Sequence, residues 1–213
     1  MGLKQLAGRL VRRFSGDTLM VRSLQHALVP SLRTLAASLP EGARVLDVGA
    51  KNALYRSIFK HCEFLTLDIE SKYQPDIIGN LLELDAVVPE ASFDAIICTE
   101  VLEHVRSPKL ALDQMRRALK PHGTLVASTP FLVPYHPDPS DYWRMTGEGW
   151  SELTREFSST TLTAHGNQPL SVWYLAGMGW GMPLRLLDGL VFATFRRMRS
   201  NAVYLGILCQ ARR

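Results

Sequence analysis

Arg44-Val45-Leu46-Asp47-Val48-Gly49 is the stretch of sequence that decides the fold. It is a short run of β-forming apolar residues that ends at a glycine. Two runs of the same kind follow, Leu65-Thr66-Leu67-Asp68 and Phe93-Asp94-Ala95-Ile96-Ile97-Cys98. Ligands of open α/β sheets bind at the carboxyl ends of the strands, so the polar groups at these ends face one crevice. The pattern therefore predicts an α/β sheet with a ligand site at one edge.

The spacing of two acids indicates what this crevice binds. Asp47 stands two residues before Gly49, and Asp68 lies 21 positions after Asp47. An acid at that distance is placed to accept hydrogen bonds from ribose hydroxyls. A dinucleotide site would show Gly-x-Gly-x-x-Gly directly after the strand, whereas residues 49–53 contain a single glycine. We therefore expect an enzyme with a nucleoside-carrying cofactor and without hydride transfer.

Alternating strands and helices continue along the chain. The expected strands are 44–48, 63–68, 76–78, 93–98, 124–129, 160–165 and 203–209. The expected helices are 3–14, 19–39 with an interruption near Pro30, 53–60, 107–119 and 147–157. Short connections between such elements predict a doubly wound, mostly parallel sheet with helices on both faces.

The length of 213 residues fits one domain with a full core. We divide it into an N-terminal helical segment, a cofactor-binding core, a helical insertion and a last strand, at residues 1–43, 44–165, 166–200 and 201–213. Three widely spaced cysteines suggest neither a disulfide framework nor a zinc site, which favours a reduced cytoplasm. No secretory signal is expected, and the longest apolar run, 169–184, is too short and too rich in glycine to span a bilayer.

The net charge of +4 is unevenly distributed, because residues 1–44 and 183–213 each carry +5 and the middle carries −6. An acidic centre between basic ends argues against a nucleic-acid partner. Basic ends rich in leucine could bind an anionic lipid surface, although solvated helix faces are the simpler interpretation. We expect a cytoplasmic protein, with peripheral contact to the inner face of the membrane left open.

Taken together, the stretch from Val45 to about Phe157 resembles the class I S-adenosylmethionine-dependent methyltransferases of the methyltransferase type 11 group. The resemblance rests on Val45-Leu46-Asp47-Val48-Gly49, Leu67-Asp68, Ser92-Phe93-Asp94-Ala95-Ile96-Ile97, Val101-Leu102-Glu103-His104-Val105 and Leu119-Lys120-Pro121-His122-Gly123. The segment 134–144 is similar to members found with bacterial polysaccharide and natural-product pathways. The resemblance implies a Rossmann-like fold with an antiparallel last strand, S-adenosylmethionine as cofactor, S-adenosylhomocysteine as product and no metal.

The resemblance also assigns cofactor contacts to residues at the strand ends. These residues are Asp47, Gly49, Ala50, Asp68, Ile69, Asn80, Leu81, Thr99 and Glu100. Asp47 would hold the ammonium end of the cofactor, directly or through water, and backbone amides at Gly49 would bind its carboxylate. Asn80 would meet the adenine amino group, with an ordinary turn as the alternative.

The loop after the first strand departs from the family pattern. The family has glycines two and four positions beyond Gly49, where this chain has Lys51 and Ala53. Asn52, between them, tolerates the left-handed backbone that such turns need. This departure keeps open a non-catalytic, membrane-apposed binding protein with a degenerate cofactor loop.

The long connection 130–145 is the candidate for substrate chemistry, because ordering so long a loop is costly without a function. Transfer to a hydroxyl needs a base, and His136 has a suitable ordinary pKa. Asp138 or Asp141 could orient its imidazole. The alternative is a proline-stiffened lid in which Asp141 pairs with Arg144. Glu103 and His104 are expected to cap a helical turn rather than to catalyse.

We therefore predict O-methylation of a small molecule or glycan. N-methylation of an amino sugar or similar amine is the alternative within enzymes, because an amine depends less on a base. The Asn/Asp-Pro-Pro-aromatic motif of related enzymes that methylate exocyclic amines of bases is absent after the strand 93–98. Thr129-Pro130-Phe131 has only a faint similarity to that motif and follows a different strand.

Overall fold

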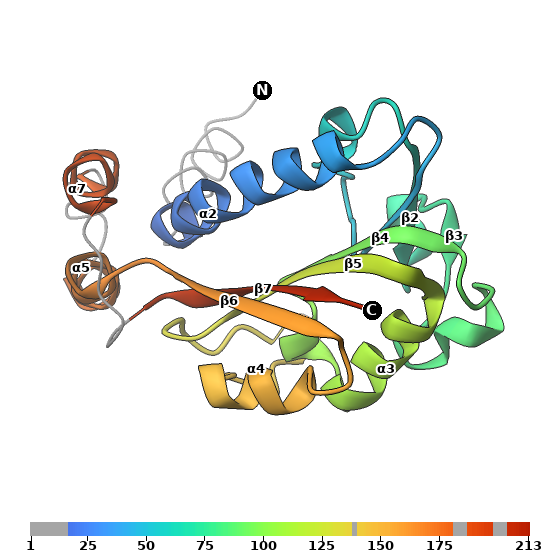
Figure 1. Cartoon of the computed structure of the whole chain (residues 1–213). Coiled ribbons are helices and arrows are strands. Elements are labelled where there is room, and N and C mark those ends of the chain that lie inside the picture. Colours follow the sequence, from blue (N-terminus) through green and yellow to red (C-terminus); the bar gives the residue numbers. More distant parts are fainter. Residues whose placement is uncertain (1–16, 138–139, 181–186, 198–203) are drawn as a thin grey trace, which may run out of the picture.

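The computed structural model describes residues 17–137, 140–180, 187–197 and 204–213. Within these residues the strands form one sheet with the order β3-β2-β1-β4-β5-β7-β6 (Figure 1). The strands are β1 (Arg44–Val48), β2 (Glu63–Asp68), β3 (Ile77–Ile78), β4 (Phe93–Thr99), β5 (Leu119–Pro130), β6 (Ser159–His165) and β7 (Gly206–Arg212). β1 to β5 pair in parallel, and β7 runs antiparallel between β5 and β6. The expected Rossmann-like architecture with an antiparallel last strand is confirmed.

Helices cover both faces of this sheet, as Figure 1 shows. One face carries α2 (Asp17–Ser38), and the other carries α3 (Pro108–Ala118) and α4 (Gly147–Leu153). Among the described residues between β6 and β7, the structure has the helices α5 (Gln168–Trp180) and α7 (Asp188–Phe195). Short 3-10 helices complete the core, η1 (Arg56–Ile58), η2 (Ser71–Tyr73), η3 (Leu81–Ala86) and η4 (Leu102–His104).

The apolar runs of the strands form two core layers because neighbouring side chains point to opposite faces of the sheet. Leu46 and Ile96 pack in the layer that contains Trp150 of α4. Val45 and Ile97, each one residue away, pack in the layer beneath α2. A strand buried on both faces needs an unbroken apolar run, which is why the sheet could be predicted from residues 44–48 and 93–98.

The sequence-based prediction was wrong about two local features. Helix α2 continues through Pro30, because buried residues before and after the proline, including Leu28 and Leu32, hold it against the sheet. The expected helix 53–60 is replaced by turns and η1. Left-handed backbone at Lys51 and Ala53 prevents an α-helix from starting there.

Several element bounds also differ from the expected ones. β5 begins at Leu119, with a register shift opposite β4 near Phe93, so the Pro121-His122-Gly123 segment lies inside the strand. β7 covers Gly206–Arg212, about three residues later than expected. The expected helix 3–14 lies outside the described residues. In the part of the chain that the structure describes, no helix has both the length and the hydropathy of a membrane span.

Candidate active site

A pocket of about 440 Å³ opens at the carboxyl ends of β1, β2 and β4, where the sequence predicted the cofactor. Of the nine expected cofactor residues, the pocket is lined by Gly49, Asp68, Ile69, Asn80, Leu81 and Glu100. Asp47, Ala50 and Thr99 lie at the ends or just beyond the ends of β1 and β4 but do not line it. Another cavity, of about 590 Å³ beside α2 and β6, contains none of the nine.

Gly49 is required by geometry at the floor of this pocket. Its φ is +67°, and a Cβ atom there would lie 2.5 Å from Cγ2 of Val101. Its amide donates a hydrogen bond to the Leu67 carbonyl at 2.8 Å. That amide is therefore used inside the sheet and is not free to bind the methionine carboxylate, as the sequence analysis expected of it.

The loop 49–53 keeps left-handed backbone at the two positions where the resemblance implies glycine. Lys51 has φ 41° and Ala53 has φ 49°. Asn52 does not have a positive φ, so the expectation that it would supply the left-handed residue was wrong. A left-handed conformation costs an ordinary residue about 1–2 kcal/mol, so the loop retains this path at an energetic cost.

Two buried acids stand at the pocket edge with different partners. The Asp68 carboxylate accepts hydrogen bonds from the backbone amides of Glu70 at 2.9 Å and Lys51 at 3.4 Å, which fixes it at the pocket wall. Asp47 is only 2% exposed, and burial raises its pKa to about 7 against the opposing effect of Arg56. A buried acid of this kind is stabilised by a cationic ligand.

The Asn80 side chain has a structural use. Its Oδ1 accepts a hydrogen bond from the backbone amide of Leu82 at 3.0 Å and caps η3. The carbonyl oxygen that was expected to meet adenine is therefore already engaged, although Asn80 and Leu81 both line the pocket.

Two further carboxylates lie just beyond β4, one half-buried and one fully buried. Glu100 has a left-handed φ of 54°, and its Oε1 accepts a hydrogen bond from Ser128 Oγ at 2.7 Å. Burial raises its pKa to about 7. Glu103 in η4 is 0% exposed, and neither of its carboxylate oxygens has a hydrogen-bond partner. Burial, reinforced by the nearby Glu100, raises the pKa of Glu103 to about 9.

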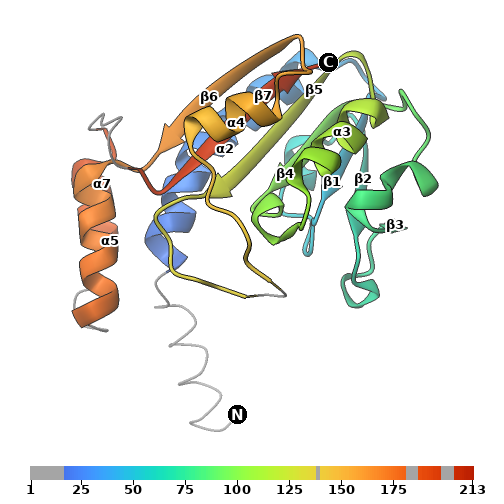
Figure 2. The same ribbon diagram turned by 90° about the horizontal axis from the view of Figure 1, so that it is seen from below.

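The loop 130–145 packs against η4 and over one side of the pocket. Figure 2 shows this loop, in yellow, leaving the end of β5 and returning to α4. The amide of Tyr142 donates to the Glu103 carbonyl at 2.7 Å, and Trp143 Nε1 donates to the Val105 carbonyl at 2.8 Å. Ser140 and Tyr142 line the pocket. The loop therefore stands beside the cofactor pocket.

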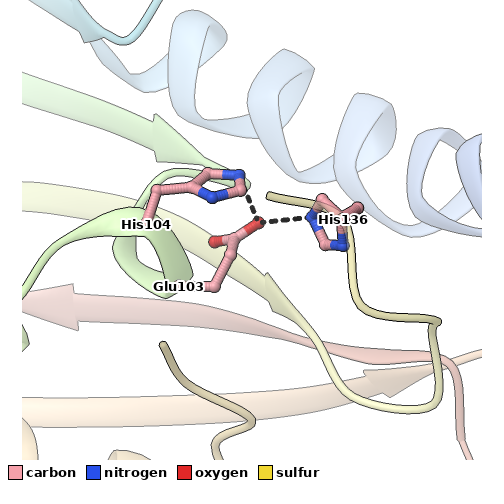
Figure 3. Close-up of side chains that lie close together, drawn as sticks. All are labelled: Glu103, His104 and His136. Carbon is pink, nitrogen blue, oxygen red and sulfur yellow. Dashed lines mark ion pairs between the residues drawn. The ribbon is translucent and has the colours of Figure 1, made fainter. Parts of the chain in front are cut away.

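This packing brings His136 next to the pair that was expected to cap a turn. In Figure 3, Glu103 and His104 from η4 and His136 from the loop point toward one another. Nε2 of His104 lies 3.7 Å from Oε1 of Glu103, and Nε2 of His136 lies 4.0 Å from the same oxygen. The capping expectation was wrong, because no side chain caps η4 or α3.

Asp141 contacts both His136 and Arg144. Its Oδ2 accepts a hydrogen bond from the His136 amide at 3.0 Å and lies 3.4 Å from His136 Nδ1. Arg144 donates to both carboxylate oxygens, at 2.5 and 2.6 Å, and holds the pKa of Asp141 down at about 2. The Asp141–Arg144 pair and the Asp141–His136 contact, which the sequence analysis gave as alternatives, are thus both present. Asp138 lies outside the described residues.

Sequence reasoning missed Glu103 as a site residue. The available signal was its position, three residues after Glu100 and directly after a strand that ends at the pocket. Its burial depends on the loop 130–145, which packs on η4 from more than thirty residues away in the sequence.

A parallel sheet with an acid at the end of its second strand, beside a pocket large enough for a nucleoside, is the architecture of class I S-adenosylmethionine-dependent methyltransferases. The family described as "Methyltransferase domain" matches residues 20–165, so the chain belongs to this family. The match covers β1 to β6 and the whole pocket.

Solved structures support the same fold. A SAM-dependent methyltransferase from Archaeoglobus fulgidus superposes with a TM-score of 0.63 at 14% identity, covering 97% of this chain and 99% of that one. A second S-adenosylmethionine-dependent methyltransferase, from Mesorhizobium loti, gives a TM-score of 0.56 at 19% identity, covering 86% and 96%.

Curated relatives match over a shorter stretch. A ubiquinone biosynthesis O-methyltransferase from Xanthomonas axonopodis pv. citri is 35% identical over 121 residues, which is 49% of this chain and 51% of the relative. The corresponding protein of Xylella fastidiosa is also 35% identical over 121 residues, 49% of each chain. The chain thus spans about half the length of the curated relatives it matches.

Proposed function

We propose that this protein transfers the methyl group of S-adenosylmethionine to a hydroxyl oxygen of a small molecule or glycan. The observation that carries the proposal is the Glu103–His104–His136 cluster beside the cofactor pocket. A hydroxyl acceptor must lose its proton as it is methylated, so groups that promote this loss are needed close to the cofactor.

The proposed cofactor contacts use the acids at the strand ends. Asp68, held by two backbone amides, accepts hydrogen bonds from the ribose hydroxyls. Asp47 balances the ammonium group of the methionine end. When bound, S-adenosylmethionine supplies a methyl group made electrophilic by its sulfonium. Ile69, Leu81 and Tyr142 offer apolar surface in the same pocket for the adenine ring.

The proposed acceptor position lies on the side of the pocket that faces His136. The His136 side chain is 42% exposed, so this side of the cluster is open to an acceptor from solvent. Asp141 fixes the orientation of the imidazole, a role for which Asp138 remains a second candidate. Nε2 can act on the hydroxyl by taking its proton, as predicted from the sequence, or by holding a cation, which is considered below.

Oxygen is favoured over nitrogen as the acceptor atom for two reasons. An amine is already a nucleophile when neutral and does not need a buried acid and two imidazoles beside it. The curated relatives are named O-methyltransferases. N-methylation of an amino sugar or similar amine is the second candidate. A non-catalytic binding protein is less well supported, since the pocket and the left-handed loop backbone are retained.

The cofactor half of this proposal is tested by titration calorimetry with S-adenosylmethionine. A charged acceptor of ribose hydrogen bonds contributes about 1.5–3 kcal/mol, so Asp68→Ala should weaken binding about tenfold to a hundredfold. Glu63→Ala, an exposed acid at the far end of β2, is the matched control and should bind normally. An unchanged dissociation constant for Asp68→Ala would show that the ribose lies elsewhere.

The transfer itself is tested with methyl-labelled S-adenosylmethionine and a panel of a catechol, a simple phenol, a hexose and an amino sugar. We expect label in a hydroxyl-bearing acceptor and S-adenosylhomocysteine in equal amount. Label found only on the amine would establish the N-methyltransferase alternative. Tight cofactor binding without transfer to any acceptor would favour the non-catalytic alternative.

We also propose contact with an anionic membrane surface. Helices α5 and α7 extend beyond the β6–β7 side of the sheet (Figure 1). Their exposed apolar side chains include Val172, Leu175 and Leu190, and Arg196 and Arg197 follow at the end of α7. Apolar side chains next to arginines are typical of segments that lie on anionic lipid.

A further inference from the structure

The hydrogen bonds of the two imidazoles define where their lone pairs point. His104 Nδ1 lies within hydrogen-bonding distance of the Ser140 carbonyl. His136 Nδ1 lies 3.0 Å from the Pro134 carbonyl and 3.4 Å from the Asp141 carboxylate. Carbonyl and carboxylate oxygens only accept, so each Nδ1 carries a proton, and in the neutral imidazole each Nε2 then carries a lone pair. The one competing donor to His136, Arg144 Nη2, is further away at 3.5 Å.

Both Nε2 lone pairs face the carboxylate of Glu103, which leaves three acceptor atoms around one point. The separations of 3.7 and 4.0 Å from Glu103 Oε1 are too long for direct hydrogen bonds. Neither Glu103 oxygen has a hydrogen-bond partner, although the residue is fully buried. With Glu103 ionised and both imidazoles neutral, the three acceptors repel one another unless a proton or a metal cation lies among them.

Arg144 does not supply that cation. Its guanidinium donates to Asp141, to the Trp143 carbonyl and to the Pro134 carbonyl. It lowers the pKa of Glu103 through space but does not hydrogen-bond to its oxygens. No other described side chain therefore supplies a cation at the centre of the cluster, so the place is filled either by a proton on one of the three groups or by a bound metal ion.

We propose that Glu103, His104 and His136 bind a divalent transition-metal cation such as Zn²⁺ or Mn²⁺. One ligand atom from each residue lies within 4.8 Å of the others. Ligands about 2.1 Å from a shared ion lie about 3–4 Å from one another, which small side-chain rotations achieve here. Two imidazoles and one carboxylate are a donor set that suits these ions.

The surroundings of the cluster match those of metal-binding histidines. Such a histidine usually donates its second ring N–H to a backbone carbonyl or carboxylate, which fixes the ring and the tautomer. His104 has this arrangement through Ser140, and His136 has it through Pro134 and Asp141. Three protein ligands with one side open to solvent leave a position for a substrate oxygen, as in catalytic rather than structural sites.

This inference extends the proposed function by assigning the activation of the acceptor. With its oxygen beside the cation, the acceptor hydroxyl loses its proton to water more easily. The oxygen then forms a bond to the methyl carbon while the carbon–sulfur bond breaks. The bonding electron pair stays on sulfur, which gives the methyl ether, S-adenosylhomocysteine and one released proton. His136 would then act as a ligand rather than as the proton acceptor.

Metal binding is tested on the full chain after treatment with a chelator and dialysis. Calorimetry with ZnCl₂ and paramagnetic resonance with MnCl₂ should each show one bound ion per chain for at least one of the two metals. His136→Ala and Glu103→Gln should each weaken this binding at least about tenfold. His122→Asn is the control, because His122 is an exposed histidine in β5, outside the cluster. Asparagine is chosen because it tolerates the positive φ of this position.

His136→Ala replaces a partly exposed residue and should fold even if Glu103→Gln does not. No stoichiometric binding of either metal, or binding unchanged by His136→Ala, would overturn the metal site. Methyl transfer that persists in excess chelator would remove the cation from catalysis while leaving the proposed methyltransferase intact. Metal binding without methyl transfer would instead count against the proposed function and leave the site standing.

Discussion

Asp47 is the residue whose ionisation is most directly linked to the proposed cofactor site. Burial raises its pKa from 3.8 to about 7, so near pH 6 the free protein holds it mostly protonated. An adjacent ammonium group favours the carboxylate, and binding should therefore release a proton. The same raised pKa means that the free protein loses the stability contributed by protonated Asp47 as the pH rises from about 4 to 7.

We expect the affinity for S-adenosylmethionine to rise between pH 6 and 8, by at most about tenfold per pH unit below pH 7. Calorimetry in buffers of different ionisation enthalpy measures the proton release. Asp47→Asn should bind more weakly and release fewer protons. Glu100, whose pKa is also raised to about 7, is a second group at the pocket that can release a proton. Equal proton release by parent and variant would show that Asp47 does not contact the ammonium group.

His136 carries the prediction for turnover. Removing a positioned base typically costs about 10² to 10⁴ in rate, and losing a metal ligand should lower the rate as well. His136→Ala should therefore lower methyl transfer strongly while the calorimetric affinity for S-adenosylmethionine stays within about twofold, because His136 does not line the cofactor pocket. Turnover within about threefold of the parent would leave the loop 130–145 with a positioning role alone.

At the scale of elements, the loop after β1 stores strain that a glycine would release. Ala53 has φ 49°, which costs an alanine about 1–2 kcal/mol. Glycine removes this strain, but it also makes the unfolded chain more flexible, which offsets about 0.4–1 kcal/mol of the gain. Ala53→Gly should therefore stabilise the protein by about 0.5–1 kcal/mol, which raises Tm by about 1–4 °C.

The control for this prediction is Ala27→Gly, at an interior position of helix α2. There the same substitution should destabilise the protein by about 1 kcal/mol, since glycine is a poor helix former. Thermal unfolding of the two variants gives the comparison. A drop in Tm for Ala53→Gly equal to that for Ala27→Gly would show that residue 53 is not held in the left-handed region.

The elements that were predicted correctly are those whose signal is local. Apolar runs such as 44–48 and 93–98 are typical of strands buried on both faces, so the strands and the pocket at their ends could be predicted from them. The sequence was misleading at Pro30, where burial of α2 outweighs the cost of a proline. It was also misleading after Gly49, where left-handed backbone occurs without glycine.

The same distinction between local signals and tertiary packing applies to the residues of the candidate site. Asp68 and Gly49 could be located because Asp68 is the last residue of β2 and Gly49 directly follows β1. Glu103 could not be recognised, because its burial comes from the loop 130–145 and its lack of a partner is a property of the folded chain. His136 was proposed from its residue type, but its neighbours Glu103 and His104 emerged only from tertiary packing.

At the scale of the whole molecule, the basic ends carry the prediction about membranes. Deletion of residues 1–14 should abolish sedimentation with acidic liposomes at low salt, because it removes four of the basic side chains. In the full-length chain, the separate substitution Leu190→Glu, at a position 67% exposed on α7, should weaken sedimentation as well. Neutral liposomes serve as the control. Equal sedimentation of parent and truncated protein, or none for either, would exclude docking through this segment.

The position of β7 between β5 and β6 bears on how the chain folds during its synthesis. β6 joins the sheet only through β7, which lies more than forty residues later in the sequence. As the chain leaves the ribosome, β1 to β5 can pair with one another, while β6 has no neighbour to bind. Until β7 emerges, β5 presents an open strand edge of the kind that recruits other chains. Completion of the sheet is therefore delayed until β7 has been synthesised.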